Sequence, residues 1–261
     1  MKNLLVLVYI ILSIGGFAQS NNKLGGKKIY VCPPCGNPTC DHMIFDEPGT
    51  CPHCAMDLED LNIKDSLQKI TVALYLQDNV EILDFAGPLE VFQIAGFHVF
   101  TVSKKKENLV TQRTLSFTPD YSINDAPPSN VMAFFGGGHV RPMEDANVIE
   151  WIQSRKPKTE YVFTVCTGAF IAGKAGLLDN LTATTYHSQI PSLQNALPKT
   201  KVVSNVRFVD NGKVITTAGI SAGIDGALHF VSKVRSVEYA QAVAKAMEYE
   251  YWKPNNGLIV K

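Results

Sequence analysis

The chain has no excess of either charge and no apolar run long enough to span a membrane comfortably. Lysine plus arginine number 24, and so do aspartate plus glutamate, with no basic stripe carrying interleaved aromatic residues. Proteins that bind nucleic acid through their charge carry such a stripe, so we expect no nucleic-acid partner. The 261 residues, 46% of them hydrophobic, are enough for one large globular domain and a small appendage.

The N-terminus has the pattern of an export signal. Lys2 supplies a positive charge, residues 4–14 are apolar, and the sequence GFA at residues 16–18 offers small residues to a signal peptidase. We expect residues 1–18 to be a removable signal peptide that leaves no stable membrane insertion, and residues 19–29 to be a linker. An uncleaved anchor is the alternative. In both cases we expect the body of the protein to be periplasmic or secreted.

Five of the six cysteines lie in residues 30–60. Cys32 and Cys35 form one C-x-x-C pair, and Cys51 and Cys54 form another, with fifteen residues between the pairs. Two such pairs supply the four soft ligands of a tetrahedral zinc ion. A segment of about thirty residues buries too little surface to fold alone, and a metal would stabilise it. We expect these four cysteines to bind zinc or another soft metal.

This segment also resembles small heavy-metal-binding, zinc-ribbon-like domains that begin Tyr-x-Cys-Pro and end Cys-Pro-x-Cys-x-Met-x-Leu. The matching residues are Tyr30, Cys32, Pro33, Cys51, Pro52, Cys54, Met56 and Leu58. Cys35 stands where those domains usually carry histidine, and Ala55 replaces a usual glycine, so copper is an alternative metal. Cys40, His42 and His53 are further candidate ligands. Two disulfides, or a redox dithiol at Cys-Pro-His-Cys, are the competing interpretations.

The larger part of the chain is organised around Cys166. Residues 161–164 are β-branched or aromatic and predict a buried strand, and residues 169–175 predict a helix. Cys166 therefore lies in a sharp strand-to-helix turn. A helix N-terminus favours negative charge, so we expect a thiol there to lose its proton more easily and to act as a nucleophile. The alternative is a buried core cysteine.

Strands and helices alternate through the main domain, residues 68–252. Strands are predicted at 68–76, 97–102, 131–135, 161–164, 182–185, 201–203 and 213–216, with a hairpin within 109–123. Helices are predicted within 80–95 and at 144–154, 169–175, 221–234 and 237–249, with Pro88 near the start of the first. This order predicts an α/β fold with a mostly parallel sheet covered on both faces.

Ligands bind such sheets at the carboxyl ends of the strands, where three loops of this chain converge. These loops carry Asp84, the glycine turn at residues 136–139, and Cys166. Backbone N–H groups of the turn, together with that of Thr167, would hold a negative oxygen beside the sulfur. A plain turn is the alternative, and His139 either lines the same pocket or lies in solvent.

Four segments resemble the PfpI-like superfamily of class I glutamine amidotransferase-like proteins. They read ILDFAGPLEVF, AFFGGGH, VCTGAFIAGKAGLLDNLTATTYH and ITTAGISAGIDGALHFV. The nearest branch contains isonitrile hydratases and the amidotransferase-like sensor domains of some AraC-type regulators. The resemblance covers residues 70–250 and implies a flavodoxin-like sandwich, usually a homodimer. It also implies a small-molecule substrate and no cofactor in the main domain.

The resemblance also implies roles for particular residues. Cys166 takes the nucleophile position, and Asp84 takes that of an acidic residue that hydrogen-bonds the sulfur. Gly137, Gly138 and Thr167 take positions that contribute backbone donors. A carboxylate stabilises a neighbouring thiolate only when it is itself protonated, so we expect Asp84 to have a raised pKa.

Two departures from the branch bear on function. Tyr186 stands where the branch has histidine, with His187 one place later; both are candidate pocket residues. Tyrosine does not accept a proton near neutral pH, which argues against a Cys–His dyad. The chain ends soon after Trp252, so we expect no DNA-binding helices there, and Asp225 is expected to be structural.

Two functional hypotheses and a structural alternative follow from this pattern. The first is an enzyme in which the Cys166 thiolate adds to an electrophilic carbon of a small molecule, such as an isonitrile, an α-oxoaldehyde or an amide. The second is a non-catalytic metal or redox sensor whose Cys166 is oxidised. The third interpretation is a structural dimer without activity.

Overall fold

The computed structural model describes residues 30–32, 40, 43–60, 70–112, 115–249, 251–254 and 256–260. The chain falls into two compact units that divide between residues 66 and 67. The predicted signal peptide and linker, Cys35 and His42 lie outside the described residues. Within the described ranges, no helix is both long and apolar enough to cross a membrane.

The smaller unit contains a three-stranded antiparallel sheet with β1 (Tyr30–Val31) at its centre, paired with β2 (Ile44–Phe45) and β3 (Glu59–Asp60). Strands of two residues form few ladder hydrogen bonds and cannot hold a sheet together by themselves. The buried side chains described in this unit are cysteines rather than aliphatic residues. Its stability therefore depends on what the sulfur atoms bind.

The larger unit is built on one eight-stranded sheet of order β15-β13-β14-β10-β9-β4-β5-β8. The strands are β4 (Thr71–Tyr75), β5 (His98–Ser103), β8 (Tyr121–Ser122), β9 (Val131–Phe134), β10 (Tyr161–Val165), β13 (Phe208–Asp210), β14 (Val214–Thr217) and β15 (Leu258–Ile259). Neighbours are parallel except β13 and β14. The predicted mostly parallel α/β sheet is confirmed. The predicted hairpin is β6 (Leu109–Val110) with β7 (Ser116–Phe117), and β11 (Thr182–Ala183) pairs with β12 (Lys201–Val202).

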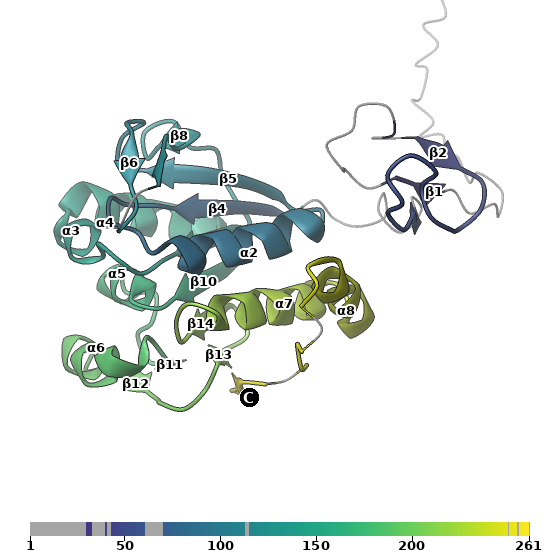
Figure 1. Ribbon diagram of the computed structural model, residues 1–261. Helices are drawn as coiled ribbons and strands as arrows, with labels where there is room; N and C mark the ends of the chain where they lie inside the picture. Colours follow the sequence, from purple (N-terminus) through teal and green to yellow (C-terminus); the bar gives the residue numbers. More distant parts are fainter. Residues whose placement is uncertain are drawn as a thin grey trace, which may run out of the picture. The chain divides into compact units, whose positions relative to one another are not determined.

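Helices cover both faces of this sheet (Figure 1). One face carries α2 (Ile82–Ile94), α7 (Ala222–Val234) and α8 (Val237–Ala246), which pack on one another. The other carries α3 (Val140–Glu144), α4 (Ala146–Arg155), α5 (Gly168–Lys174) and α6 (Ile190–Ala196). Short 3₁₀ turns cover Lys156–Lys158 and His187–Gln189.

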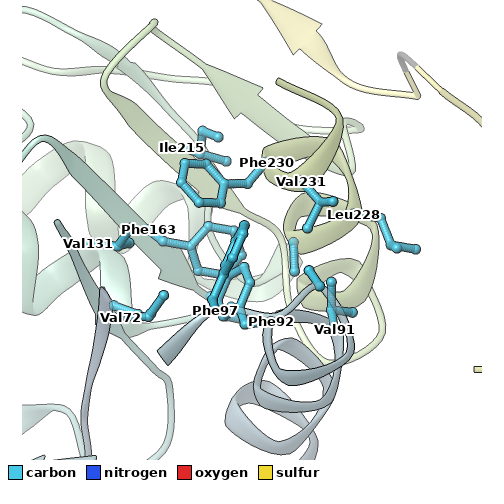
Figure 2. Close-up of a cluster of buried hydrophobic side chains, with 14 of the residues drawn as sticks. Val72, Val91, Phe92, Phe97, Val131, Phe163, Ile215, Leu228, Phe230 and Val231 are labelled. Carbon is cyan, nitrogen blue, oxygen red and sulfur yellow. The ribbon is translucent and has the colours of Figure 1, made fainter. Parts of the chain in front are cut away.

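Each face of the sheet has its own hydrophobic core, because side chains alternate along a strand. In β4, Val72 and Leu74 belong to the cluster beneath α2 and α7, whereas Ala73 and Tyr75 belong to the opposite cluster. Figure 2 shows the first cluster, in which the Phe92 ring lies 5.6 Å from that of Phe163. Because the strands are buried on both faces, packing fixes the positions at which they end. The loops that follow these ends, and that form the site, are positioned in turn.

The helices differ from prediction where local chemistry intervenes. Pro88 lies inside α2 rather than near its start, and proline has no N–H to donate to the carbonyl of Asp84 four residues earlier. The helix predicted at 144–154 is α4, which begins at Ala146 because Asp145 caps it by accepting the Asn147 N–H; the short α3 before it was not predicted. Strands β13 and β15 and helix α6 were not predicted, because such short segments show no clear hydrophobic period.

Candidate functional site

Cys166 follows β10 and precedes α5, as the sequence predicts, and adopts a left-handed backbone conformation with φ of 57°. This conformation costs a non-glycine residue about 1–2 kcal/mol. Two hydrogen bonds hold it in place: the Cys166 N–H donates to the carbonyl of Thr217 in β14 at 3.3 Å, and the hydroxyl of Thr185, in the segment after β11, donates to the Cys166 carbonyl at 2.7 Å. The side chain is 7% exposed. The strand-to-helix turn at Cys166, called the elbow below, thus holds the sulfur in a nearly closed space.

Asp84, in the first turn of α2, lies beside this sulfur and is completely buried. Its Oδ2 accepts the Gly136 N–H at 3.0 Å, and its Oδ1 accepts the Ile220 N–H at 2.8 Å. The Cys166 thiol is the neighbouring titratable group, since Oδ2 and the sulfur both border the position of a Gly136 Cβ. The site therefore joins the elbow, the glycine turn, the start of α2 and the turn before α7.

Burial governs the proton affinity of both groups. It raises the pKa of Asp84 to about 6, although the two backbone donors favour the charged form. The sequence predicts this direction. The expectation for the thiol was wrong: burial, followed by the charge of Asp84, raises the pKa of Cys166 far above its ordinary value. The thiol therefore keeps its proton at neutral pH, and Asp84 is the more acidic of the two groups.

Thr167 offers two donors near the sulfur. Its N–H and its hydroxyl both act to lower the pKa of Cys166 and so favour a thiolate, although burial and the charge of Asp84 outweigh them. The Gly137 N–H donates to the same hydroxyl at 3.3 Å. The sequence predicts an oxyanion cradle for a substrate from these amides, whereas in the resting structure they support the sulfur, directly or through Thr167. Gly138, the third expected donor, has φ of 52° and packs so closely on Asp78 that a Cβ would lie 2.0 Å from its carbonyl oxygen.

Gly219 and Ile220 were missed by sequence reasoning, and Gly136 was predicted only as part of the glycine turn, without a role of its own. A Cβ at Gly136 would lie 2.6 Å from Asp84 Oδ2 and 2.8 Å from the Cys166 sulfur, so only glycine fits between them. A Cβ at Gly219 would lie 3.3 Å from the same sulfur. Ile220, with φ of 54°, supplies the second amide to Asp84. The glycine run and the ISAGID motif were visible in the sequence, but not which of their groups face the thiol.

The predicted pocket residues form ring contacts in this region. The Tyr186 ring lies 2.8 Å from where a Gly219 Cβ would be and so borders the space beside the sulfur. His187 packs on Tyr186 with ring centroids 4.3 Å apart. His139 packs on Phe170 at 5.0 Å, and burial lowers its pKa. Tyr186 is thus the aromatic wall that the structure places near Cys166.

A surface hollow of about 550 Å³ lies elsewhere, lined by Lys104, Asn124 and Trp151 among others. None of its lining residues belongs to the Cys166 site. The space beside the sulfur is bounded by Asp84, Gly136, Gly219 and Tyr186, and it is narrow because a Cβ at either glycine would lie within 3.3 Å of the sulfur.

The smaller unit brings four cysteines together. The Sγ atoms of Cys32, Cys40, Cys51 and Cys54 all lie within 4.8 Å of one another, and those of Cys32 and Cys54 are 3.4 Å apart. Sulfur ligands of a tetrahedral zinc ion lie about 3.8 Å apart, as Zn–S bonds of about 2.3 Å require. The cluster therefore fits a soft metal ion. Three of its members were predicted ligands.

The fourth member, Cys40, was a further candidate ligand in the sequence, and the predicted ligand Cys35 lies outside the described residues. His53 is exposed and is not among the clustered ligands. Ala55 adopts φ of 57°, a conformation that favours the glycine expected at this position from the resemblance.

Residues 70–233 match the model of the DJ-1/PfpI family. The chain belongs to this family. Isonitrile hydratase from Pseudomonas putida is 34% identical over 185 residues, which cover 69% of this chain and 78% of the hydratase. The transcriptional regulator GbdR from Pseudomonas aeruginosa is 21% identical over 187 residues, which cover 69% of this chain and 51% of the regulator. The predicted superfamily is therefore confirmed, and its relatives include both an enzyme and a regulator.

Solved structures agree with this membership. A THiJ/PfpI family protein from Pseudomonas syringae superimposes with a TM-score of 0.68 at 25% identity, covering 78% of this chain and 86% of that one. DJ-1beta from Drosophila melanogaster gives a TM-score of 0.63 at 22% identity, covering 70% of this chain and all of that one. The fold is that of the DJ-1/PfpI family, and the chain is a cysteine-based enzyme or sensor of this superfamily.

Proposed function

We propose that this protein is an exported hydratase that adds water to a small isonitrile through Cys166. The observation that carries the proposal is the contact between the Cys166 thiol and the fully buried Asp84 carboxyl, whose pKa is raised to about 6. A base that titrates near working pH transfers protons efficiently in both directions. The 34% identity to an isonitrile hydratase supports this choice of substrate.

The chemistry balances with these two side chains and one water molecule. The S–H bond of Cys166 breaks, its proton passes to Asp84, and the sulfur bonds to the terminal isonitrile carbon. Asp84 returns the proton to that carbon, which gives a thioimidate. Water then adds across the C=N bond, with its proton on nitrogen, and the C–S bond breaks to release an N-substituted formamide and the thiol.

The narrow site favours a slim substrate. An isonitrile carbon ends a linear group and carries no substituent, so it can reach the sulfur of Cys166, a residue that is only 7% exposed. Thr167 would stabilise the sulfur as charge builds on it, through the two donors that already face it. The main domain needs no cofactor for this reaction.

The remaining parts of the proposal concern location and assembly. The apolar N-terminal sequence supports export to the periplasm or beyond, and family membership supports a homodimer. The four-cysteine cluster supports zinc as the metal of the smaller unit, because all-thiolate tetrahedral sites suit it.

The test is direct. Purified protein is mixed with cyclohexyl isocyanide, and formation of N-cyclohexylformamide is followed by proton NMR. We expect steady turnover by the wild type, none by Cys166→Ala, and at least about a 100-fold loss in Asp84→Asn, as for removal of a general base. Turnover that survives Cys166→Ala would refute the proposal, as would a wild type that is alkylated at Cys166 yet forms no formamide from a panel of alkyl and aryl isonitriles.

A second candidate is a metal or redox sensor, which the fused cysteine cluster favours because hydration needs no such segment. In that case mild peroxide would convert Cys166 to sulfenic or sulfinic acid, and the protein would turn over no isonitrile. Mass spectrometry of the Cys166 peptide after peroxide treatment, together with metal analysis of the purified protein, separates the two functions.

A further inference from the structure

Gln77 lies just after β4, at the sheet edge that carries the site, and is 5% exposed. Its side-chain Nε2 donates to the carbonyl of Phe135 at 2.9 Å and to that of Gly137 at 2.6 Å. The carbonyl between them, that of Gly136, accepts the Glu81 N–H at 2.9 Å. Both hydrogens of the amide group thus have an acceptor in the glycine turn.

These contacts determine where the amides of the turn point. In a planar trans peptide, the C=O of one residue and the N–H of the next point in opposite directions. Holding the Phe135 carbonyl toward Gln77 therefore turns the Gly136 N–H away from it, and that N–H donates to Asp84 Oδ2. In the same way, the carbonyl held by Glu81 sets the direction of the Gly137 N–H, which donates to Thr167.

A glycine turn needs such an external constraint. Gly137 and Gly138 have φ of 72° and 52°, a region that glycine enters and leaves at little cost, so the run has no intrinsic preference for the observed orientation. Close packing also constrains the turn, since a Cβ at Gly137 would lie 2.3 Å from the carbonyl oxygen of Asn79. Packing restricts the space available to the turn, whereas Gln77 fixes its peptide planes.

We propose that Gln77 is a positioning residue, which orients the glycine turn so that the Gly136 N–H faces Asp84 beside Cys166. It touches neither the sulfur nor the carboxylate and acts through the Phe135–Gly136 peptide. This role rests on the proposed function only in that the Cys166–Asp84 pair is the reactive centre. The orientation itself is testable without a substrate.

The experiment measures alkylation of Cys166 in the full chain by iodoacetamide from pH 4.5 to 9, with mass spectrometry of the Cys166 peptide. Gln77→Met keeps the size of the side chain and removes both donors, and Gln77→Glu keeps its shape. Gln93→Met, at an exposed position of α2, is the matched control. In the wild type we expect the rate to rise with a midpoint near 6, the value for Asp84.

In both Gln77 variants we expect the midpoint to move up by about one pH unit, because weakening one hydrogen bond to the charged carboxylate favours its protonated form. Gln93→Met should match the wild type. A merely structural role for Gln77 would lower the melting temperature and leave the midpoint unchanged, and that result would overturn the inference.

A measurement on the wild type covers the case in which neither variant folds. The two side-chain amide protons of Gln77, observed by NMR with ¹⁵N-labelled glutamine, should exchange slowly and give separate resonances that shift with a midpoint near 6. Fast exchange would overturn the inference. A normal alkylation profile without isonitrile turnover would refute the proposed function alone.

Discussion

Ile220 donates its backbone N–H to Oδ1 of Asp84 at 2.8 Å, from a left-handed conformation that a β-branched residue rarely adopts. Cys166 reaches the same carboxyl from the same region of backbone space. Two strained residues and one buried carboxyl thus meet in a small volume. Such strain persists only where the surrounding fold enforces it, and it lowers stability in return for a fixed geometry.

Asp84 should make stability fall as pH rises. Its pKa is raised by folding from 3.8 to about 6, so the folded state binds the proton more tightly. Well below pH 3.8 both states are protonated, and the penalty grows between the two pKa values. The advantage of Asp84→Asn over wild type should therefore increase by about 2 kcal/mol from pH 4 to pH 7.

Urea unfolding followed by tryptophan fluorescence measures this difference at each pH. Asp179→Asn, which alters an exposed carboxyl paired with Lys199, is the control and should give a difference that changes little with pH. If the difference in the free energy of unfolding between Asp84→Asn and wild type stays constant with pH, folding does not raise the pKa of Asp84.

Gly136→Ala should disable the site while leaving the sheet intact. The added methyl group would lie 2.6 Å from Asp84 Oδ2 and 2.8 Å from the Cys166 sulfur, so one of them must move. Displacement of a reacting group by about 1 Å costs about 100-fold in rate, which we expect for Cys166 alkylation at pH 7. Gly176→Ala introduces a strained alanine in open space and should leave the rate unchanged. Equal alkylation rates in Gly136→Ala and Gly176→Ala would show that the methyl group at position 136 displaces neither Asp84 nor Cys166.

Cys40 should be a metal ligand. Its sulfur lies in the cluster with those of Cys32, Cys51 and Cys54, so Cys40→Ser should weaken zinc binding by more than tenfold, whereas Cys35→Ser should retain it. Competition with a chromogenic chelator, on protein prepared with and without zinc, measures both affinities. The reverse ranking of the two variants would assign the fourth ligand to Cys35.

Asp225 should contribute to stability rather than to reactivity. It accepts Arg207 Nε at 2.6 Å and the Tyr249 hydroxyl at 3.0 Å, and it is 5% exposed. Asp225→Asn leaves a partly exposed arginine without its charge partner, and we expect a loss of about 1–3 kcal/mol in the free energy of unfolding. The pH midpoint of Cys166 alkylation should stay that of wild type. A shifted midpoint would place Asp225 in the site.

The sequence by itself determined the features that depend on neighbours in the chain. Alternating strands and helices predict the parallel sheet, and the strand–cysteine–helix order around Cys166 predicts the elbow. Four motif segments indicate the family, and clustered cysteines indicate a metal-binding segment. Each of these is a local pattern of residue type and spacing.

Only the tertiary structure decided which groups meet. The two amides on Asp84 come from Gly136 and Ile220, which lie far from it in the chain, and Cys40 enters the metal cluster by folding rather than by C-x-x-C spacing. Even the direction in which the pKa of Cys166 is shifted was decided by the tertiary structure. A helix N-terminus favours the thiolate, but burial among residues from several elements and the charge of Asp84 favour the thiol more strongly. Desolvation depends on everything packed around a group, and no local pattern in a sequence encodes that environment.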